Sequence, residues 1–535
     1  MSTLTGTGQV LRFLLRRDRV RAPLWVLGMT LMTAYIVVEL GTVLDEESLQ
    51  GMAQMASAPV TALIGGPGYG FDDITVPRFL AGLYGAYLML GAAFMSMTTI
   101  TRHTRAEELH GRAELTLAGA IGRHAPLTAA LLLAVGMNVV TAGLMAGVIL
   151  AAPVDSGGAS TLLFTSSIAA VGIAFAGVAA TTAQLSPYSR TCTSLAGVVL
   201  AGAFLIRGLG DMSRAQGGDL AWLSWLSPLG WAQHTAPYTH DRWWPLAFPL
   251  LFAAAGVALG YTLRARRDLG AGVLGDRPGR AHAPAWLGSP VALAYRLQRG
   301  SLRGWSVAML LTGLLLGAFT DLMADIADTL PAEMLAVMGG GEAIVDGYLG
   351  FMSVYFGVIL SVFAILAVQS LRAQEAGGHT EAILATAVGH REWVLSWVGV
   401  AGAGVLWLSA LAGLGEGLGA VLVTGDRSLL LPTLLGHTVQ FAPVWFLLGL
   451  ATALYGLVPR ALGAVWVVFV GGTLLSFFGP ILGLSQTWLN LSPFGHVGQH
   501  PATDVAWTGV AVLAVAGLAL AFLGAGAFRR RDLRA

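Results

Sequence analysis

The residues of this chain that could do chemistry are concentrated in one charged motif that occurs twice. The pattern R-x-x-E-x-x-G-x-x-E-x-x-x-A spans 105–118 and recurs at 372–385, a constant offset of 267 residues. A water-facing helix with both signs of charge can dock a partner protein through complementary charges. A solvated connecting helix is the alternative, but a mere spacer does not require the same polar pattern twice. The docking residues that we predict are Arg105, Glu107, Glu108, Gly111 and Glu114, and Arg372, Glu375, Gly378 and Glu381.

Catalytic chemistry is not indicated elsewhere. His103, His110 and His124 share the first charged segment with glutamates, but no HExxH or Cys/His pattern accompanies them. Cys192 is the one cysteine, which excludes an internal disulfide. All thirty basic residues are arginine, whereas a Walker A loop binds phosphate through a lysine. We therefore expect no catalytic residue, no metal and no cofactor on this chain.

Long apolar segments must position these motifs. The chain is 55% hydrophobic and 11% charged, whereas soluble domains carry about 25% charged residues. A membrane-spanning helix needs about 20 mostly apolar residues. We therefore predict an all-α polytopic membrane protein with about twelve transmembrane helices. The predicted spans are 23–44, 79–100, 126–151, 161–184, 192–209, 244–263, 305–320, 347–370, 393–415, 433–457, 461–479 and 504–527.

The distribution of arginine predicts the orientation of these spans. With the N-terminus in the cytoplasm, 25 of the 30 arginines fall in cytoplasmic segments, as the positive-inside rule requires. Acidic residues favour the outer loops, among them Asp45, Glu46, Glu47, Asp72, Asp73, Asp321, Asp325 and Asp328. We expect a multi-pass protein of the cell membrane with both termini in the cytoplasm.

Further matches indicate that the whole chain is duplicated. LSPLG at 226–230 recurs as LSPFG at 491–495, and RDL at 267–269 recurs at 531–533. The arginine-rich segment 11–21 is repeated at 293–303. An even number of spans in each repeat gives parallel halves. We predict six-span halves at 1–263 and 291–535, joined by a cytoplasmic linker at 264–290.

The outer side carries the remaining candidates. The Ser-Pro loops, with Ser227 and Pro228 in one half and Ser492 and Pro493 in the other, predict a re-entrant hairpin or half-helices. They could anchor the structure or gate a pathway. The charged residues near outer span ends are Glu39, Arg207, Glu416 and Asp504. They could mark a pathway, but we favour the interpretation that they snorkel to the interface.

Taken with these motifs, the chain resembles the type-2 permeases of ABC exporters. More narrowly, it resembles the fused twelve-span form of actinobacterial putative polyketide antibiotic exporters. The resemblance implies coupling helices at about 103–121 and 371–388, and elbow helices at 11–21 and 293–303. It also implies that spans two and five of each half line the pathway. The candidate lining residues are Tyr84, Tyr87, Phe94, Met95, Tyr355, Phe356 and Phe363.

The resemblance implies a function as well. The chain would be the permease subunit of an ATP-driven exporter, moving hydrophobic or amphipathic small molecules, antibiotic-like or lipid, outward by alternating access. Two ABC ATPase subunits on the cytoplasmic side would carry ATP and Mg²⁺. Gln374 and His379 replace Glu107 and Arg112 in the second copy, so the two ATPase contacts would be unequal. A proton-coupled multidrug transporter and a membrane enzyme acting on lipids are the alternatives.

Overall fold

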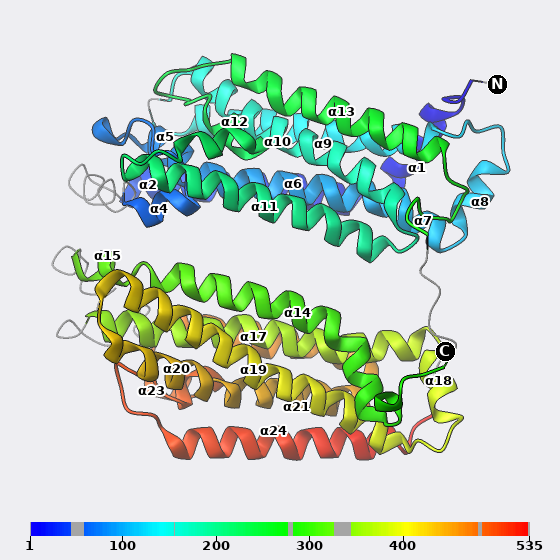
Figure 1. Ribbon diagram of the computed structural model, residues 1–535, viewed down its shortest axis with the longest axis vertical. Helices are drawn as coiled ribbons and strands as arrows, with labels where there is room; N and C mark the ends of the chain where they lie inside the picture. Colours follow the sequence, from blue (N-terminus) through cyan, green and yellow to red (C-terminus); the bar gives the residue numbers. More distant parts are fainter. Residues whose placement is uncertain are drawn as a thin grey trace. The chain divides into compact units, whose positions relative to one another are not determined.

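The computed structural model describes residues 2–43, 58–154, 156–275, 282–325, 344–479 and 484–532, and every regular element within them is a helix (Figure 1). Twelve helical segments are long and apolar enough to cross a membrane. The prediction of an all-α polytopic membrane protein is confirmed. The chain divides into two compact units, Met1–Gly279 and Arg280–Ala535. Asp45, Glu46, Glu47 and Asp328 lie outside the described residues.

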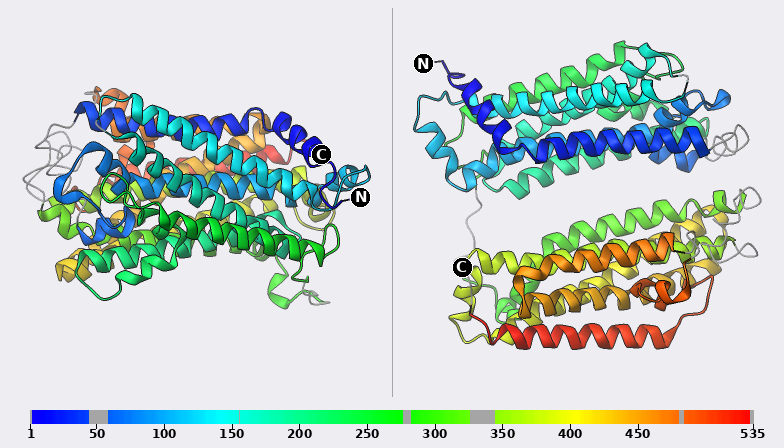
Figure 2. Two further views of the ribbon diagram at one scale, coloured as in Figure 1. Left: turned by 90° about the horizontal axis from the view of Figure 1, so that it is seen from above. Right: turned by 180° about the vertical axis from the view of Figure 1, so that it is seen from behind.

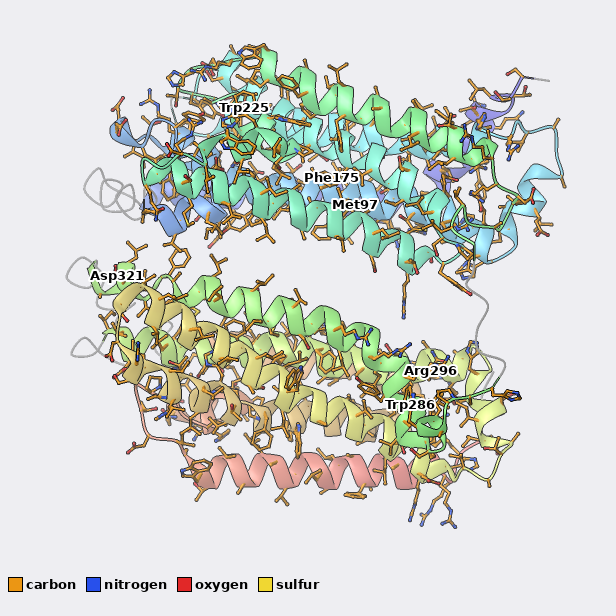
Figure 3. All side chains as sticks on the ribbon, viewed as in Figure 1. Met97, Phe175, Trp225, Trp286, Arg296 and Asp321 are labelled. Atoms are coloured by element: carbon orange, nitrogen blue, oxygen red, sulfur yellow. The ribbon has the colours of Figure 1, made fainter. Side chains whose placement is uncertain are left out.

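The first unit is a bundle of long helices with short helices at both of its ends (Figure 1). Its helices are α1 (Thr7–Arg17), α2 (Arg21–Val43), α4 (Pro59–Ile64), α5 (Val76–Phe79), α6 (Gly85–His103), α7 (Arg105–Leu109), α8 (Arg112–Leu117), α9 (Ala125–Ala151), α10 (Gly158–Leu185), α11 (Ser189–Ala215), α12 (Pro228–Gln233) and α13 (Ala247–Ala265). The most buried is α10, which packs against α6, α9 and α13. Met97 and Phe175 lie fully buried among these helices (Figure 3).

The second unit repeats this arrangement. Its helices are α14 (Pro290–Gly317), α15 (Thr320–Asp325), α17 (Ile344–Ala376), α18 (His379–Leu384), α19 (His390–Thr424), α20 (Leu430–Val439), α21 (Phe441–Leu457), α22 (Val465–Phe478), α23 (Gln486–Leu489) and α24 (Trp507–Phe528). Glycines let α21 and α24 approach closely. A Cβ added at Gly456 would lie 2.0 Å from the carbonyl oxygen of Gly524, so larger side chains would force the two helices apart.

The two ends of each unit carry different short elements. The end that carries α7 and α8, or α18, is here named the motif end, and the opposite end, which carries the Ser-Pro loop, the loop end. In the first unit, α1 and α8 lie at the motif end in two views (Figures 1 and 2), and Trp225 lies at the loop end (Figure 3). In the second unit, α18 lies at the motif end and α23 at the loop end (Figure 1).

The two arginine-rich N-terminal segments fold differently. In the first unit α1 is a separate helix that ends at Arg17, and the buried Asp18 that follows it pairs with His103 (Nε2 to Oδ2, 2.6 Å) and Arg102 (Nη1 to Oδ1, 3.0 Å). In the second unit the segment 293–303 is part of the unbroken helix α14. The sequence match places Gly300 where the first unit has Asp18, and glycine has no side chain to form such pairs.

Candidate functional site

The duplicated motif forms a helix end, a turn and a short projecting helix in both units. In the first unit α7 is followed by Gly111, whose φ of +70° begins α8. In the second unit α17 runs on to Ala376, and Gly378 begins α18 with a φ of +73°. Glycine adopts this left-handed backbone without strain. The E-x-x-G-x-x-E spacing therefore separates an inner glutamate before the turn from an outer glutamate after it.

The inner glutamate of the first unit is buried beneath arginines. Arg267, which follows α13, donates two hydrogen bonds to Glu108, from Nη2 to Oε1 at 2.7 Å and from Nη1 to Oε2 at 2.8 Å. Arg105 also pairs with Glu108, and Arg264 Nη1 lies 3.6 Å from its Oε1. A buried carboxylate is tolerated when it is paired and hydrogen-bonded in this way.

The arginines of this cluster also bind the chain on either side. Arg267 Nε donates to Gln184 Oε1 at the end of α10 (2.8 Å), and Arg105 Nη2 donates to the carbonyl oxygen of Ala271 (2.8 Å). The backbone N–H of Val273 donates to the carbonyl oxygen of Gln184 (2.9 Å). The segment after α13 is therefore fastened to α7 and α10.

The second unit forms the same interaction with the other copy of each motif. Arg531, which follows α24, donates to both carboxylate oxygens of Glu375 at 2.7 Å. Tyr455 of α21 donates its hydroxyl to Glu375 Oε2 at 2.7 Å. The Arg531 guanidinium lies 5.1 Å from the Tyr455 ring centroid and 4.8 Å from that of Phe528, within the range of cation–π attraction.

We name the pairs Glu108–Arg267 and Glu375–Arg531 the clamps. Each clamp joins the inner glutamate of a motif to the arginine of an RDL sequence after the last long helix of its unit. Sequence analysis found both motifs but missed Arg267 and Arg531 as their partners. The sequence does contain a signal for this pairing, because the glutamate motif and the RDL sequence are both duplicated. The paired residues are 159 positions apart in one unit and 156 in the other.

The prediction of a water-facing charged helix is therefore wrong for the inner part of the motif. Arg105 is fully buried, and Glu108 and Glu375 are buried as well. The outer residues, Glu114 and Glu381, are exposed.

The outward surface of each motif is a short helix with one exposed glutamate in its first turn. Glu114 is in the first turn of α8 and Glu381 in the first turn of α18. Gly111 and Gly378 are exposed, and Leu115 on α8 has 79% of its surface accessible. An exposed leucine beside an exposed charge is suited to contact with another protein.

Glu107 adds a contact with the N-terminal helix of the first unit. Its carboxylate lies 2.6 Å from Arg17 Nη1 on α1 and 3.2 Å from Arg112 Nε on α8. The hydrogen bond to Glu107 raises the pKa of Arg17 above its usual value. The corresponding residue of the second unit is Gln374, which carries no charge for such an ion pair.

The aromatic and methionine residues predicted to line a pathway divide into two groups. Met95, Phe356 and Phe363 are buried in the hydrophobic cores of their units. Tyr87 is 38% exposed, Phe94 47% and Tyr355 40%, and Tyr84 is half-buried. Only this second group reaches the surface of a unit in this structure.

The two Ser-Pro loops form the same helix-capping hydrogen bond. Ser227 Oγ accepts a hydrogen bond from the Leu229 N–H at 3.2 Å, and Pro228 begins α12. Ser492 Oγ likewise accepts from the Phe494 N–H at 3.3 Å, and Pro493 begins a 3₁₀ turn. Serine as helix cap and proline at the first helical position are mutually suited. The Ser-Pro sequence therefore starts a short helix in each unit.

The interpretation that the charges near the span ends snorkel to the interface is wrong for two residues. Arg207 is fully buried and donates to the carbonyl oxygens of Leu63 (3.0 Å) and Ile64 (3.1 Å). Glu416 is fully buried, and its Oε2 lies 2.8 Å from His437 Nε2. Hydropathy does not distinguish a residue facing lipid from one facing another helix. Asp504 is exposed before α24, and the side chain of Glu39 lies outside the described structure.

Each histidine of the first charged segment contacts a neighbouring group of the protein. His103 binds Asp18, His110 contacts the carbonyl oxygen of Ala106 on its own helix, and His124 packs edge-on against Tyr261. Within the described parts of the chain, His, Cys, Asp and Glu form no group of three that could hold a metal ion.

Comparison with known proteins identifies the family. The multidrug efflux system permease protein Rv1217c of Mycobacterium tuberculosis (strain ATCC 25618 / H37Rv) is 37% identical over 540 residues, which are 100% of this chain and 96% of that protein. A family model described as the C-terminal domain of multidrug efflux system permease Rv1217c matches residues 8–263 and 287–529. The chain belongs to the Rv1217c permease family.

The Rv1217c family match includes the glutamate of each clamp but not the arginine. Glu108 and Glu375 lie within the matched residues, whereas Arg267 and Arg531 each follow the end of a matched segment. The contacts of the structure, not the family match, are therefore what assign these arginines to the site.

The burial of Glu108 predicts unequal effects of two substitutions in one motif. Glu108→Ala leaves the buried guanidinium groups of Arg105 and Arg267 without their carboxylate, so we expect a loss of about 3–5 kcal/mol of unfolding free energy. The exposed Glu114→Ala should change it by no more than about 0.5 kcal/mol. Denaturant titration of the purified protein in mixed micelles measures both values, and equal losses would contradict the assignment of inner and outer glutamates.

The loop end of the first unit predicts a pH dependence. His234 is stacked on Trp225 and bonded to Tyr69 and Ser224. Burial, with the charges of Arg214 and Arg242, lowers the pKa of His234 to about 4. The unfolded histidine titrates near 6.5, so it binds a proton that the folded histidine does not.

Stability should therefore fall as the pH drops from 6.5 to 4, by up to about 3 kcal/mol. Unfolding midpoints measured across this range should lose most of that slope in His234→Gln. An unchanged slope in the variant would show that other groups cause it.

Proposed function

We propose that this chain is the permease subunit of an ATP-driven ABC exporter that moves hydrophobic or amphipathic small molecules, such as drugs, outward by alternating access. The multidrug efflux named for its relative supports a drug-efflux permease. The ATP-driven part of the proposal is supported by the motif ends of the two units. Each unit presents a projecting short helix, and the helical segment just before that short helix is clamped to the chain that follows the last long helix.

The clamp is the observation that carries the proposal. A helix that receives a mechanical push from a motor subunit must be attached firmly to the helices that it moves. The bidentate Glu375–Arg531 pair, with the Tyr455 hydroxyl, provides such an attachment for the end of α17, from which α18 projects. Bidentate pairing adds geometric specificity to the strength of the charged hydrogen bonds. Glu108 and its arginines hold α7, which precedes α8, in the same manner.

The motor would be a pair of separate ABC ATPase subunits that bind ATP and Mg²⁺. This chain has no lysine for a Walker A loop, and its two motif copies offer two docking helices. Only the first copy has the ion pair between Glu107 and Arg17 on α1, so we expect the two ATPase contacts to differ in strength. The arginine distribution supports a cytoplasmic position for both motif ends and both termini in a bacterial cell membrane.

The substrate class follows from the surfaces of the helices that carry the motifs. Tyr87 and Phe94 on α6 and Tyr355 on α17 are partly exposed. Aromatic side chains bind varied apolar compounds through large flat faces, and the tyrosine hydroxyls add hydrogen bonds. We propose these three residues as pathway-lining.

A proton-coupled transporter is the second candidate, and one observation favours it. Glu416 and His437 form a buried pair inside two helices of the second unit, and ionisable residues within membrane spans often belong to proton pathways.

The docking assignment predicts the effect of reversing the outer charges. Glu114→Arg and Glu381→Arg together should reduce co-purification of the ATPase subunits at least about tenfold, because a like-charge contact costs several kcal/mol. Asp219→Arg, an equally exposed carboxylate at the loop end, is the matched control and should leave co-purification unchanged. Retention of both ATPase binding and efflux in the double variant would contradict the assignment.

The energy source can be tested with Glu416→Gln in proteoliposomes that contain the complete complex. We expect dye transport to require ATP, to be independent of an imposed pH gradient, and to change less than about twofold in the variant, since glutamine has nearly the shape of glutamate beside His437. Transport driven by the pH gradient alone and abolished by Glu416→Gln would instead establish the proton-coupled function.

A further inference from the structure

The side chains at the loop ends of the two units differ. The Ser-Pro loop that both units share allows these side chains to be compared position by position. LSPLG and LSPFG align with an offset of 265 residues. With this alignment, α11 ends near the residue that matches the end of α22, and the turn Ala221–Leu226 matches the region of α23. Residues around the two loops can therefore be compared one by one.

In the first unit this region is filled by charged and aromatic side chains. Arg207 Nη1 donates to Gln233 Oε1 at 3.2 Å and lies 3.4 Å from Asp211 Oδ2. His234 lies under Trp225, with ring centroids 4.2 Å apart. The cavity beside Gln233 measures only about 20 Å³.

In the second unit the corresponding residues are small or uncharged. Gly472 stands at the position of Arg207, Ser476 at that of Asp211, Asn490 at that of Trp225 and Gln499 at that of His234. Glycine and serine occupy far less volume than the arginine and aspartate they replace.

A cavity of about 170 Å³ lies at this place in the second unit, between α17, α22, α23 and the Ser-Pro loop. On the same measure one water molecule needs about 10–15 Å³, so the cavity has room for on the order of ten. Three of the residues just compared, Ser476, Asn490 and Gln499, line it. The cavity is therefore lined by residues that align with Asp211, Trp225 and His234 of the first unit.

The lining specifies the chemistry of a ligand. Phe351, Phe477 and Phe494 form an apolar wall, in which the first two rings meet edge to face with centroids 5.3 Å apart. The exposed residues Gln486 and Asn490, which hydrogen-bond to each other at 2.9 Å, lie at the opening. An aromatic wall with a few amide groups is the usual composition of a small-molecule site.

Charge decides which ligands this cavity would accept. Among the described residues that line it, none carries a charge. A charged ligand buried there would lose its hydration without gaining an ion pair from these residues, which is costly. We propose that this cavity is a binding site for an uncharged, amphipathic compound with an aromatic part. This inference rests on the proposed transport function and specifies a site for its substrate.

The experiment measures binding of Nile red, an uncharged aromatic dye, to the purified full-length chain in lipid nanodiscs, with empty nanodiscs as the blank. Asn490→Trp restores the residue type of the first unit and should close the opening, as should Gln486→Trp. We expect both variants to bind the dye at least about tenfold more weakly than the unchanged chain. Thr487→Trp is the matched control, since Thr487 is exposed on the same short helix but does not line the cavity, and it should bind normally.

Two results would overturn the inference. Either all three variants bind Nile red as the unchanged chain does, or the unchanged chain binds none. If the variants have the same unfolding midpoint as the unchanged chain, a loss of binding comes from the cavity and not from unfolding. Two cavity variants are used so that the test still stands if one of them fails to fold. Because binding is measured without ATP or ATPase subunits, its failure is separate from failure of the ATPase docking test.

Discussion

A buried carboxylate must be paired, and this requirement joins the end of the second long helix of each unit to the chain after its last long helix. Glu108 and Glu375 are both buried at the motif end, where desolvation without a partner would cost several kcal/mol. The arginine that satisfies each one comes from the segment after the last long helix, 159 and 156 residues further on. Each pair therefore fastens the segment before the projecting short helix to the end of the bundle.

The duplicated framework supports two units that are not chemically equal. The first unit adds the Glu107–Arg17 pair at its motif end and the Arg207 cluster at its loop end. The second unit has Gln374 and Gly472 at the corresponding positions, and a cavity lies beside its Ser-Pro loop. Duplication thus preserves the elements that hold the fold, the clamp and the Ser-Pro cap. The differences fall in the side chains that would contact a motor subunit or a ligand.

Hydropathy was sufficient to predict the helical class and twelve spans. The length of an apolar segment can be read from the sequence without knowing which helices pack against it. The repeats likewise located the motif and the Ser-Pro loops. Pairing across more than 150 residues was beyond this reasoning, so Glu108 and Glu375 were expected to face water. The same limit applies to Arg207 and Glu416, since composition does not show which face of a helix meets another helix. The pairing of Asp18, just after α1, with His103 is also a long-range contact.

The central claim is that the inner glutamate and the RDL arginine stabilise the fold through one shared interaction. A double-mutant cycle on the Glu375–Arg531 clamp tests this claim most directly. Unfolding free energies are measured for Glu375→Gln, Arg531→Gln and the double variant. We predict that the two losses are strongly non-additive, with a coupling energy of at least about 1 kcal/mol, because the first substitution already breaks the shared interaction. Losses that add within about 0.5 kcal/mol would contradict the claim, since independent residues behave in that way.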